Sequence, residues 1–168
     1  IDSVKCFNAS DGRITIRNRR FSDGTSLTLD SVLIISNSTV TRYISAVVRH
    51  DQIRSGLYII NVKDQSGCTL SDTVDIYQPQ LLDTVMTEVK SESCFPGNDG
   101  HINIKMKGGT VPYIYTWSDT NQNTNSRTRL KEGRFSVDVK DQHGCRANFN
   151  NNILQFNLKS PLNLANVI

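Results

Sequence analysis

Four cysteines are the residues of this chain with the clearest covalent chemistry. They are Cys6, Cys68, Cys94 and Cys145 in a sequence of 168 residues. A disulfide that closes a loop of 50 to 60 residues stabilises a domain by roughly 4 kcal/mol on a chain-entropy estimate. Small exported domains use such bridges. We therefore expect Cys6–Cys68 and Cys94–Cys145 bridges. Four reduced, buried cysteines of a cytosolic protein are the alternative.

Other reactive side chains do not form a catalytic pattern. His50, His101 and His143 are far apart in the sequence and have no triad-like context. No Cys-x-x-Cys motif or phosphate-binding glycine loop occurs. Four aspartates in predicted turns could hold Ca²⁺, but turn capping by local hydrogen bonds is the simpler interpretation; they are Asp11, Asp64, Asp99 and Asp141. We predict no enzyme, no cofactor and no metal site.

Net charge and hydropathy exclude further classes. The charge is +3, from 19 basic and 16 acidic residues, which is too mild to predict nucleic-acid binding. No apolar run approaches the roughly 18 residues of a membrane span. A basic group near the start is expected to be a solvated strand and loop, with a docking face as the alternative; it contains Lys5, Arg13, Arg17, Arg19 and Arg20.

The chain contains an internal repeat. Lys63-Asp64-Gln65-Ser66-Gly67-Cys68 recurs as Lys140-Asp141-Gln142-His143-Gly144-Cys145, 77 positions later. The preceding apolar positions match at the same shift, and Ile76 and Gln78 are matched with Ile153 and Gln155. At the front ends, Cys6-x-x-x-x-Asp11-Gly12 recurs as Cys94-x-x-x-x-Asp99-Gly100 after 88 positions, so the first copy has about 11 extra residues between its ends.

Proline marks the boundary between the copies, because it cannot continue a central strand. We expect one module at residues 1–79, a second at 80–158, and a linker or the start of another module at 159–168, where Pro161 repeats Pro79. The chain begins without Met and ends on an apolar run, so we expect a segment of a longer polypeptide.

Hydrophobic residues alternate with polar ones, which is typical of strands with one buried face. Examples are Ile14-x-Ile16, Tyr58-x-Ile60-x-Val62 and Phe135-x-Val137-x-Val139, and residues 41–48 and 111–117 are expected to be middle strands. Short strands separated by turns over about 80 residues predict a sandwich. The predicted fold is all-β, with two tandem immunoglobulin-like β-sandwich modules.

An aromatic motif stands in the middle of the second module. Gly108-Gly109-Thr110-Val111-Pro112 leads into Tyr113, Tyr115 and Trp117, which alternate and share one face. Core packing is the favoured interpretation. The alternative is a binding face that stacks on sugar rings or on a partner protein.

The motifs together resemble the SprB-type repeat of large Bacteroidetes surface proteins, including gliding-motility adhesins. The second module carries the cysteine, the Asp-Gly pair, the Gly-Gly-Thr-x-Pro-Tyr-x-Tyr-x-Trp run and the closing Asp-x-x-Gly-Cys. The first module keeps only the ends and has an unrelated segment at residues 18–50, which leaves its strand order open.

This resemblance implies a non-catalytic structural or adhesive segment of a secreted surface protein outside the outer membrane, exported by the type IX secretion system. Its partners would be neighbouring repeat modules of the same chain, surface polysaccharide, or other surface and motility proteins. A carbohydrate- or protein-binding accessory module of an exported hydrolase is the alternative function.

Overall fold

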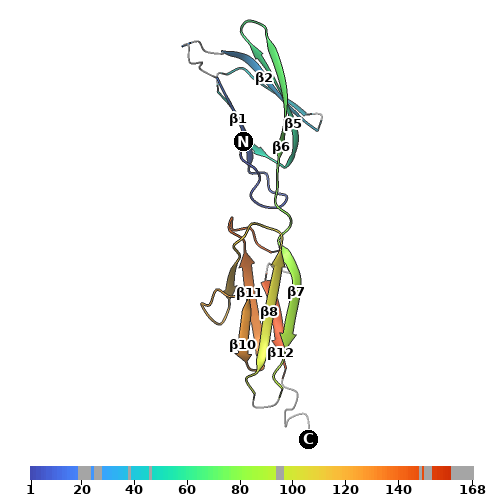
Figure 1. Ribbon diagram of the computed structural model, residues 1–168, viewed down its shortest axis with the longest axis vertical. Helices are drawn as coiled ribbons and strands as arrows, with labels where there is room; N and C mark the ends of the chain where they lie inside the picture. The colour runs from blue at the N-terminus through green and yellow to red at the C-terminus, as the bar shows by residue number, and fades with distance from the viewer. Residues whose placement is uncertain are drawn as a thin grey trace. The chain divides into compact units, whose positions relative to one another are not determined.

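The computed structural model describes residues 1–18, 24, 28–37, 39–45, 47–93, 97–147, 149 and 153–159. The chain divides into two compact units, Ile1–Gln78 and Pro79–Ile168. The described residues form twelve strands and no helix (Figure 1). The predicted all-β class is confirmed, and so is the organisation into two sandwich-like halves.

Unit 1 (Ile1–Gln78) contains six strands in two sheets. Strand β1 (Gly12–Arg17) pairs with β4 (Val47–Ile53), and the larger sheet has the order β3-β2-β5-β6. The larger sheet is made of β2 (Leu29–Ser36), β3 (Thr39–Tyr43), β5 (Gly56–Asp64) and β6 (Thr69–Ile76). All of these pairings are antiparallel.

The core of unit 1 forms because alternate residues of both sheets point inward. Its buried residues come from β1, β2, β4, β5, β6 and the segment before β1; they are Val4, Ile14, Leu29, Val32, Ile34, Val48, Ile53, Tyr58, Ile60 and Ile76. The predicted alternation of Tyr58 and Ile60 is therefore the inward face of β5.

Unit 2 (Pro79–Ile168) also has two antiparallel three-stranded sheets, in the orders β10-β8-β7 and β12-β11-β9. The strands are β7 (Asp83–Lys90), β8 (Gly100–Lys107), β9 (Ile114–Trp117), β10 (Ser126–Leu130), β11 (Gly133–Lys140) and β12 (Ile153–Leu158).

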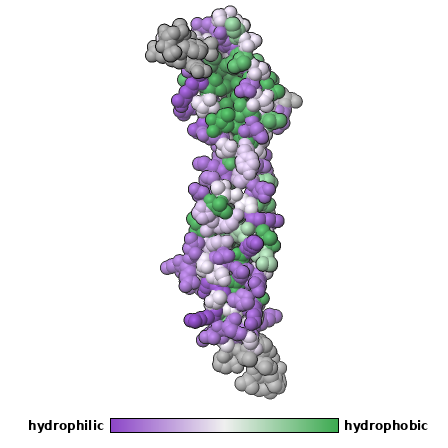
Figure 2. Space-filling view, in the orientation of Figure 1, coloured by the Kyte–Doolittle hydropathy of each residue, from purple (hydrophilic) through white to green (hydrophobic). Residues whose placement is uncertain are grey.

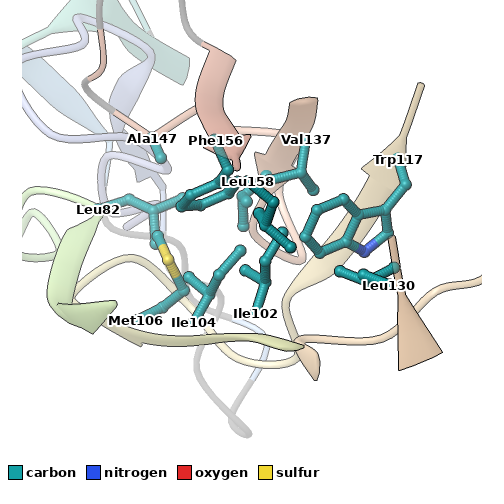
Figure 3. Packing of buried hydrophobic residues seen from close by; sticks show 11 residues of the cluster. Leu82, Ile102, Ile104, Met106, Trp117, Leu130, Val137, Ala147, Phe156 and Leu158 are labelled. Carbon is teal, nitrogen blue, oxygen red and sulfur yellow. The ribbon is translucent and has the colours of Figure 1, made fainter. Parts of the chain in front are cut away.

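Both sheets of unit 2 contribute to one core (Figure 3). Ile102, Ile104 and Met106 of β8 face side chains of β9, β11 and β12. The remaining buried members are Leu82, Trp117, Leu130, Val137, Val139, Ala147, Phe156 and Leu158. Trp117 is only 3% exposed, so this core is built around the single tryptophan of the chain.

The two units share most of one pairing scheme, although unit 1 lacks the aromatic motif and has no strand that corresponds to β7. Ile34 of β2 pairs with Ile60, and Trp117 of β9 pairs with Val137, 77 positions after Ile60. Ile34 therefore takes the place of Trp117. The extra length of the first module lies in a longer β2 and in β3, which has no partner strand of the same kind in unit 2.

Two expectations about strand positions are wrong. Residues 41–48 span the end of β3 and the start of β4 rather than one middle strand. Ile76 and Gln78 do not correspond to Ile153 and Gln155, because Gly56 pairs with Ile76 whereas Gly133 pairs with Leu158. The segment between the closing cysteine and the last strand is longer in unit 2, which moves the shift from 77 to 82.

The outer face of the larger sheet of unit 1 is partly apolar. Val40, Ile35 and Ile59 lie in one row across β3, β2 and β5. Val40 and Ile59 are exposed, as is Leu57 next along β5. Figure 2 shows that apolar side chains gather on the visible surface of unit 1.

We expect the matched pair Trp117→Ala and Ile34→Ala to destabilise different units. Removing Trp117 should cost unit 2 about 3–5 kcal/mol, and removing Ile34 should cost unit 1 about 2–5 kcal/mol, because each leaves a cavity in its own core. Amide hydrogen exchange by mass spectrometry would report on β1–β6 and β7–β12 separately. Equal loss of protection in both units after either change would contradict two independent cores.

Candidate functional site

The closing turns of the two units are built alike. In unit 2, the Asp141 side chain accepts hydrogen bonds from the backbone N–H groups of Thr110, His143 and Cys145, each at 2.9 Å. In unit 1, Asp64 accepts from the backbone N–H of Cys68 at 2.8 Å and from the Ser66 hydroxyl at 2.7 Å. The Ser66 hydrogen bond is the main cause that lowers the pKa of Asp64.

These turns differ in burial. Asp141 is 1% exposed, and three backbone N–H groups donate hydrogen bonds to its buried carboxyl group. Asp64 lies in an exposed turn. The backbone N–H that follows each aspartate bonds to an equivalent threonine carbonyl, Gln65 to Thr28 at 3.2 Å and Gln142 to Thr110 at 2.9 Å. Each closing turn is thereby tied to the segment that leads into β2 or β9.

The opening turns also repeat their contacts. Asp11 accepts from the backbone N–H of Lys5 at 3.1 Å, and Asp99 accepts from that of Ser93 at 2.8 Å. Ser93 also donates its hydroxyl to Asp99, and this hydrogen bond is the main cause that lowers the pKa of Asp99. All four aspartates thus act as turn caps. Among the described residues, no cluster of three His, Cys, Asp or Glu side chains could hold a metal ion.

The cysteines do not pair as expected in unit 1. Cys68 is a free, exposed thiol, whereas Cys6 and Cys145 are both disulfide-bonded. The predicted Cys6–Cys68 bridge is therefore wrong. Cys94 lies outside the described residues, and the Cys94–Cys145 pairing stays a prediction.

Strand β6 explains why Cys6 and Cys68 do not meet. Cys68 directly precedes β6, whose eight residues span on the order of 25 Å. Cys6 lies beyond the other end of β6, because Val4 bonds to the carbonyl of Tyr77 at 2.9 Å and Asn8 bonds to the Gln78 side chain at 2.8 Å. A disulfide needs Cα atoms within about 7 Å.

The aromatic strand packs on the core of unit 2. Trp117 is buried and donates its indole N–H to the Thr124 carbonyl at 2.8 Å. Tyr113 and Tyr115 are partly buried against the same core, and the Tyr113 hydroxyl donates to the Gly108 carbonyl at 2.7 Å. Burial raises the pKa of Tyr115. Trp117 therefore acts in packing, and Tyr113 and Tyr115 pack against the same core with part of their surface exposed.

In each unit, a side chain from the opposite sheet packs against an aromatic residue of the central strand: Arg127 against Phe135 of β11, and His50 against Tyr58 of β5. The sequence did not indicate these contacts. The Arg127 guanidinium lies 5.2 Å from the ring centre of Trp117 and 5.9 Å from that of Phe135. It also makes two hydrogen bonds to Asp119, at 2.9 and 3.0 Å. These bonds are the main cause that lowers the pKa of Asp119.

His50 takes the equivalent position in unit 1, because it pairs with Ile14 as Arg127 pairs with Ile102. Its Nδ1 is 2.6 Å from the Tyr43 hydroxyl, and its ring packs edge-on against Tyr58, 6.3 Å between centres. Burial lowers the pKa of His50. His50 is thus half-buried between two tyrosines.

The other charged candidates lie apart from these contacts. Arg13 pairs with Asp51 and lies 3.8 Å from Asp2, while Arg19 and Arg20 of the basic group lie outside the described residues. His101 Nε2 lies 3.5 Å from the Glu88 carboxylate, across the paired strands β7 and β8. The described part of the chain has no helix long and apolar enough to cross a membrane.

With this geometry in place, comparison with known proteins defines the class of the fold. Domains 1–3 of the outer capsid protein Hoc of bacteriophage RB49 match with a TM-score of 0.50 at 13% identity, over 93% of this chain and 55% of that one. A 282-residue fragment of intimin, solved with the intimin-binding domain of its receptor, matches with a TM-score of 0.45 at 10% identity, over 89% of this chain and 57% of that one.

The first eight Ig domains of Down syndrome cell adhesion molecule match with a TM-score of 0.48 at 10% identity, over 90% of this chain and 25% of that one. The chain thus spans little more than half of the Hoc and intimin fragments. The fold of both halves is immunoglobulin-like, as predicted.

A match to a known sequence family lies in the second unit. Residues 86–122 match the SprB repeat, from β7 through the aromatic strand β9. The predicted resemblance is confirmed there. No curated protein matches the chain in sequence.

We expect Asp141→Ala to destabilise unit 2 by about 3 kcal/mol or more, because it leaves three partly buried N–H donors without an acceptor at about 1–3 kcal/mol each. The matched change Asp64→Ala should cost unit 1 much less, since its donors can turn to water. Urea unfolding of both variants is the measurement. Equal losses of unfolding free energy would show that the burial of the closing turn does not determine how much its aspartate stabilises the unit.

We expect unit 1 to lose stability as the pH falls, because the pKa of His50 is lowered on folding. Its contribution is fully present above the unfolded pKa of about 6.5 and is lost as the pH falls through the folded value. Melting of unit 1 between pH 7.5 and 5 should therefore show a drop that His50→Gln reduces. The natural chain and the His50→Gln variant have the same carboxylates. Identical pH profiles of the two would therefore exclude a contribution of His50 to the pH dependence.

Proposed function

We propose that this chain is a structural and adhesive repeat segment of a large surface protein, without catalytic activity of its own. The observation that carries the proposal is that two units with separate cores and the same strand pairing follow one another, and that the second matches the SprB repeat. Modules that bury their own cores can be repeated, so that length grows with copy number.

The sequence after strand β12 supports further repetition. At the shift of 82 positions that relates the last strands of the two units, Pro79 corresponds to Pro161 and the buried Leu82 to Leu164. Val85 corresponds to Val167 at the same shift. Residues 159–168 thus repeat the start of the second module, as expected for a linker and the beginning of a third.

An extracellular location is supported by the oxidised cysteines. Cys6 and Cys145 are disulfide-bonded, and such bonds persist in oxidising compartments. With the SprB match, this supports a place on the outer side of the outer membrane, after export by the type IX system. Neighbouring modules of the same chain are the proposed primary partners, and surface polysaccharide or motility proteins are the proposed secondary ones.

We expect antibodies raised against residues 1–159 to label intact cells of the source organism, and brief protease treatment of those cells to remove the signal. An antibody to a cytosolic protein is the control and should label only permeabilised cells. Labelling that needs permeabilisation would exclude a surface role.

Binding of a small polar ligand by unit 1 is the second candidate function. A groove of about 330 Å³ opens beside His50, and polar groups line it together with the Tyr58 ring. The polar groups include Thr39, Thr41 and Asp51. This groove, and not the packed aromatic strand of unit 2, favours the accessory-module alternative.

A glycan array separates the two functions. A stalk segment should bind no glycan above the background of a Thr39→Lys, Thr41→Lys variant, whose long charged side chains fill the groove. Binding by the natural chain that this double variant abolishes would favour the accessory-module function instead.

A further inference from the structure

The outer face of the larger sheet of unit 1 carries a contiguous aliphatic patch. We call it the apolar patch, and its members are Leu33, Ile35, Val40, Leu57 and Ile59. Val40, Ile59 and Leu57 are 58%, 42% and 65% exposed, and Leu33 and Ile35 are partly exposed on the strand between them. Monomeric proteins seldom leave such a patch in water, and an exposed apolar patch marks an interaction site.

The equivalent face of unit 2 is polar. Four members of the apolar patch have a counterpart there, because β2 and β5 correspond to β9 and β11. Leu33, Ile35, Leu57 and Ile59 correspond to Thr116, Ser118, Arg134 and Ser136. Val40 lies on β3, which has no counterpart in unit 2. A unit of this kind therefore folds without an apolar outer face, so the patch of unit 1 has a purpose other than the stability of its sandwich.

Two opposite charges lie at opposite corners of the apolar patch. Arg42 of β3 pairs with Leu33, and Asp75 of β6 pairs with Leu57. Residues paired across neighbouring strands point to the same face of a sheet, so both charges lie on the outer face. Both residues are exposed, and neither side chain makes an ion pair or a hydrogen bond with another described residue. Each charge is therefore available to a partner that covers the patch.

The positions of these charges fit a second copy of the same face. In a sheet with ordinary strand spacings, the midpoint between Arg42 and Asp75 falls between the paired residues Ile35 and Ile59. A two-fold axis through this midpoint, in the plane of the interface and at about 45° to the strands, places Arg42 of each copy opposite Asp75 of the other. The face is thus complementary to itself in charge.

The same axis also brings apolar side chains together. It places Leu57 of one copy over Val40 of the other, and it leaves Ile35 and Ile59 of both copies beside the axis. The two sheets then cross at about a right angle, which is one of the two arrangements of packed sheets. The four strands offer a footprint on the order of 400 Å² per copy. Contacts of this size belong to the weak, transient class of interfaces.

We propose that the apolar patch is a self-association surface, on which unit 1 of a second copy docks face to face. Arg42 of each copy then pairs with Asp75 of the other at the edge of a dry aliphatic centre. The charge pattern favours a second copy over an unrelated partner, because the same two residues supply both sides of each ion pair. A weak contact of this kind is sufficient between copies that are held close together, since effective concentration multiplies its strength.

Sedimentation velocity of the natural chain over a series of concentrations is the first measurement. We expect an equilibrium between monomer and dimer, with a dissociation constant in the micromolar range or weaker. Arg42→Asp should raise the dissociation constant at least about tenfold, because it brings like charges together at both ends of the interface. Asp75→Arg should do the same. The double variant Arg42→Asp, Asp75→Arg should return the constant close to that of the natural chain.

Two further variants test the position of the surface. Arg134→Asp makes the same charge change on the equivalent face of unit 2 and should leave the dimer unchanged. Leu57→Arg with Ile59→Ser introduces the residues of unit 2 and should abolish the dimer, while circular dichroism shows that the fold is intact.

Three results would overturn this inference. They are a chain that stays monomeric at every concentration, association that continues beyond the dimer, and a dimer that Arg42→Asp does not weaken or that the charge-swapped double variant does not restore. Each of these results would leave the proposed structural role of the chain unaffected, because that role rests on the repeated units and not on the apolar patch.

Discussion

The structure of each unit depends on one strand that must be covered on both edges and on one face. Strand β5 in unit 1 and β11 in unit 2 each pair with two neighbours, and their alternate residues are buried. Tyr58 and Ile60 in one unit, and Val137 and Val139 in the other, face the opposite sheet. Burial of these side chains is the main favourable term of the fold. The turn that follows is thereby fixed in place, which is why the closing aspartates and cysteines repeat so closely.

The period-two pattern was sufficient to predict these strands and the all-β fold. It could not predict register, because register depends on the lengths of the connections as well as on the alternation. The longer segment after Cys145 displaces the last strand of unit 2 by five positions, so sequence matching aligned Ile76 with the wrong residue. Residues 41–48 look like one strand because the residues on both sides of the break near Ser45 have a β-like composition.

The cysteines show a different limit of the sequence. Matching positions in two copies suggested a bridge inside each copy, and loop entropy appeared to favour it. The loop-entropy estimate gives the stability that a bridge would add, but the direction of β6 decides whether the sulfur atoms of Cys6 and Cys68 can meet. The equivalence of His50 with Arg127 was likewise hidden, because the two side chains share only their place against Tyr58 and Phe135. Such pairs become visible only when strand pairing is known.

The two glycines of the aromatic motif have a structural purpose that accounts for the difference between the units. Gly108 and Gly109 have φ values of +70° and +59°, which favour glycine. A Cβ at Gly108 would lie 2.0 Å from the Leu81 carbonyl oxygen, and one at Gly109 would lie 3.0 Å from the Asp141 carboxylate. The pair therefore lets the entering chain and the closing turn approach one another.

That close approach buries Asp141, whereas unit 1 has no Gly-Gly pair and leaves Asp64 partly exposed. The motif thus fixes how the chain enters unit 2. A side chain added at either glycine would clash with the Leu81 backbone or the Asp141 side chain. It would therefore disturb the contact between the entering chain and the closing turn, and not the packing of Trp117.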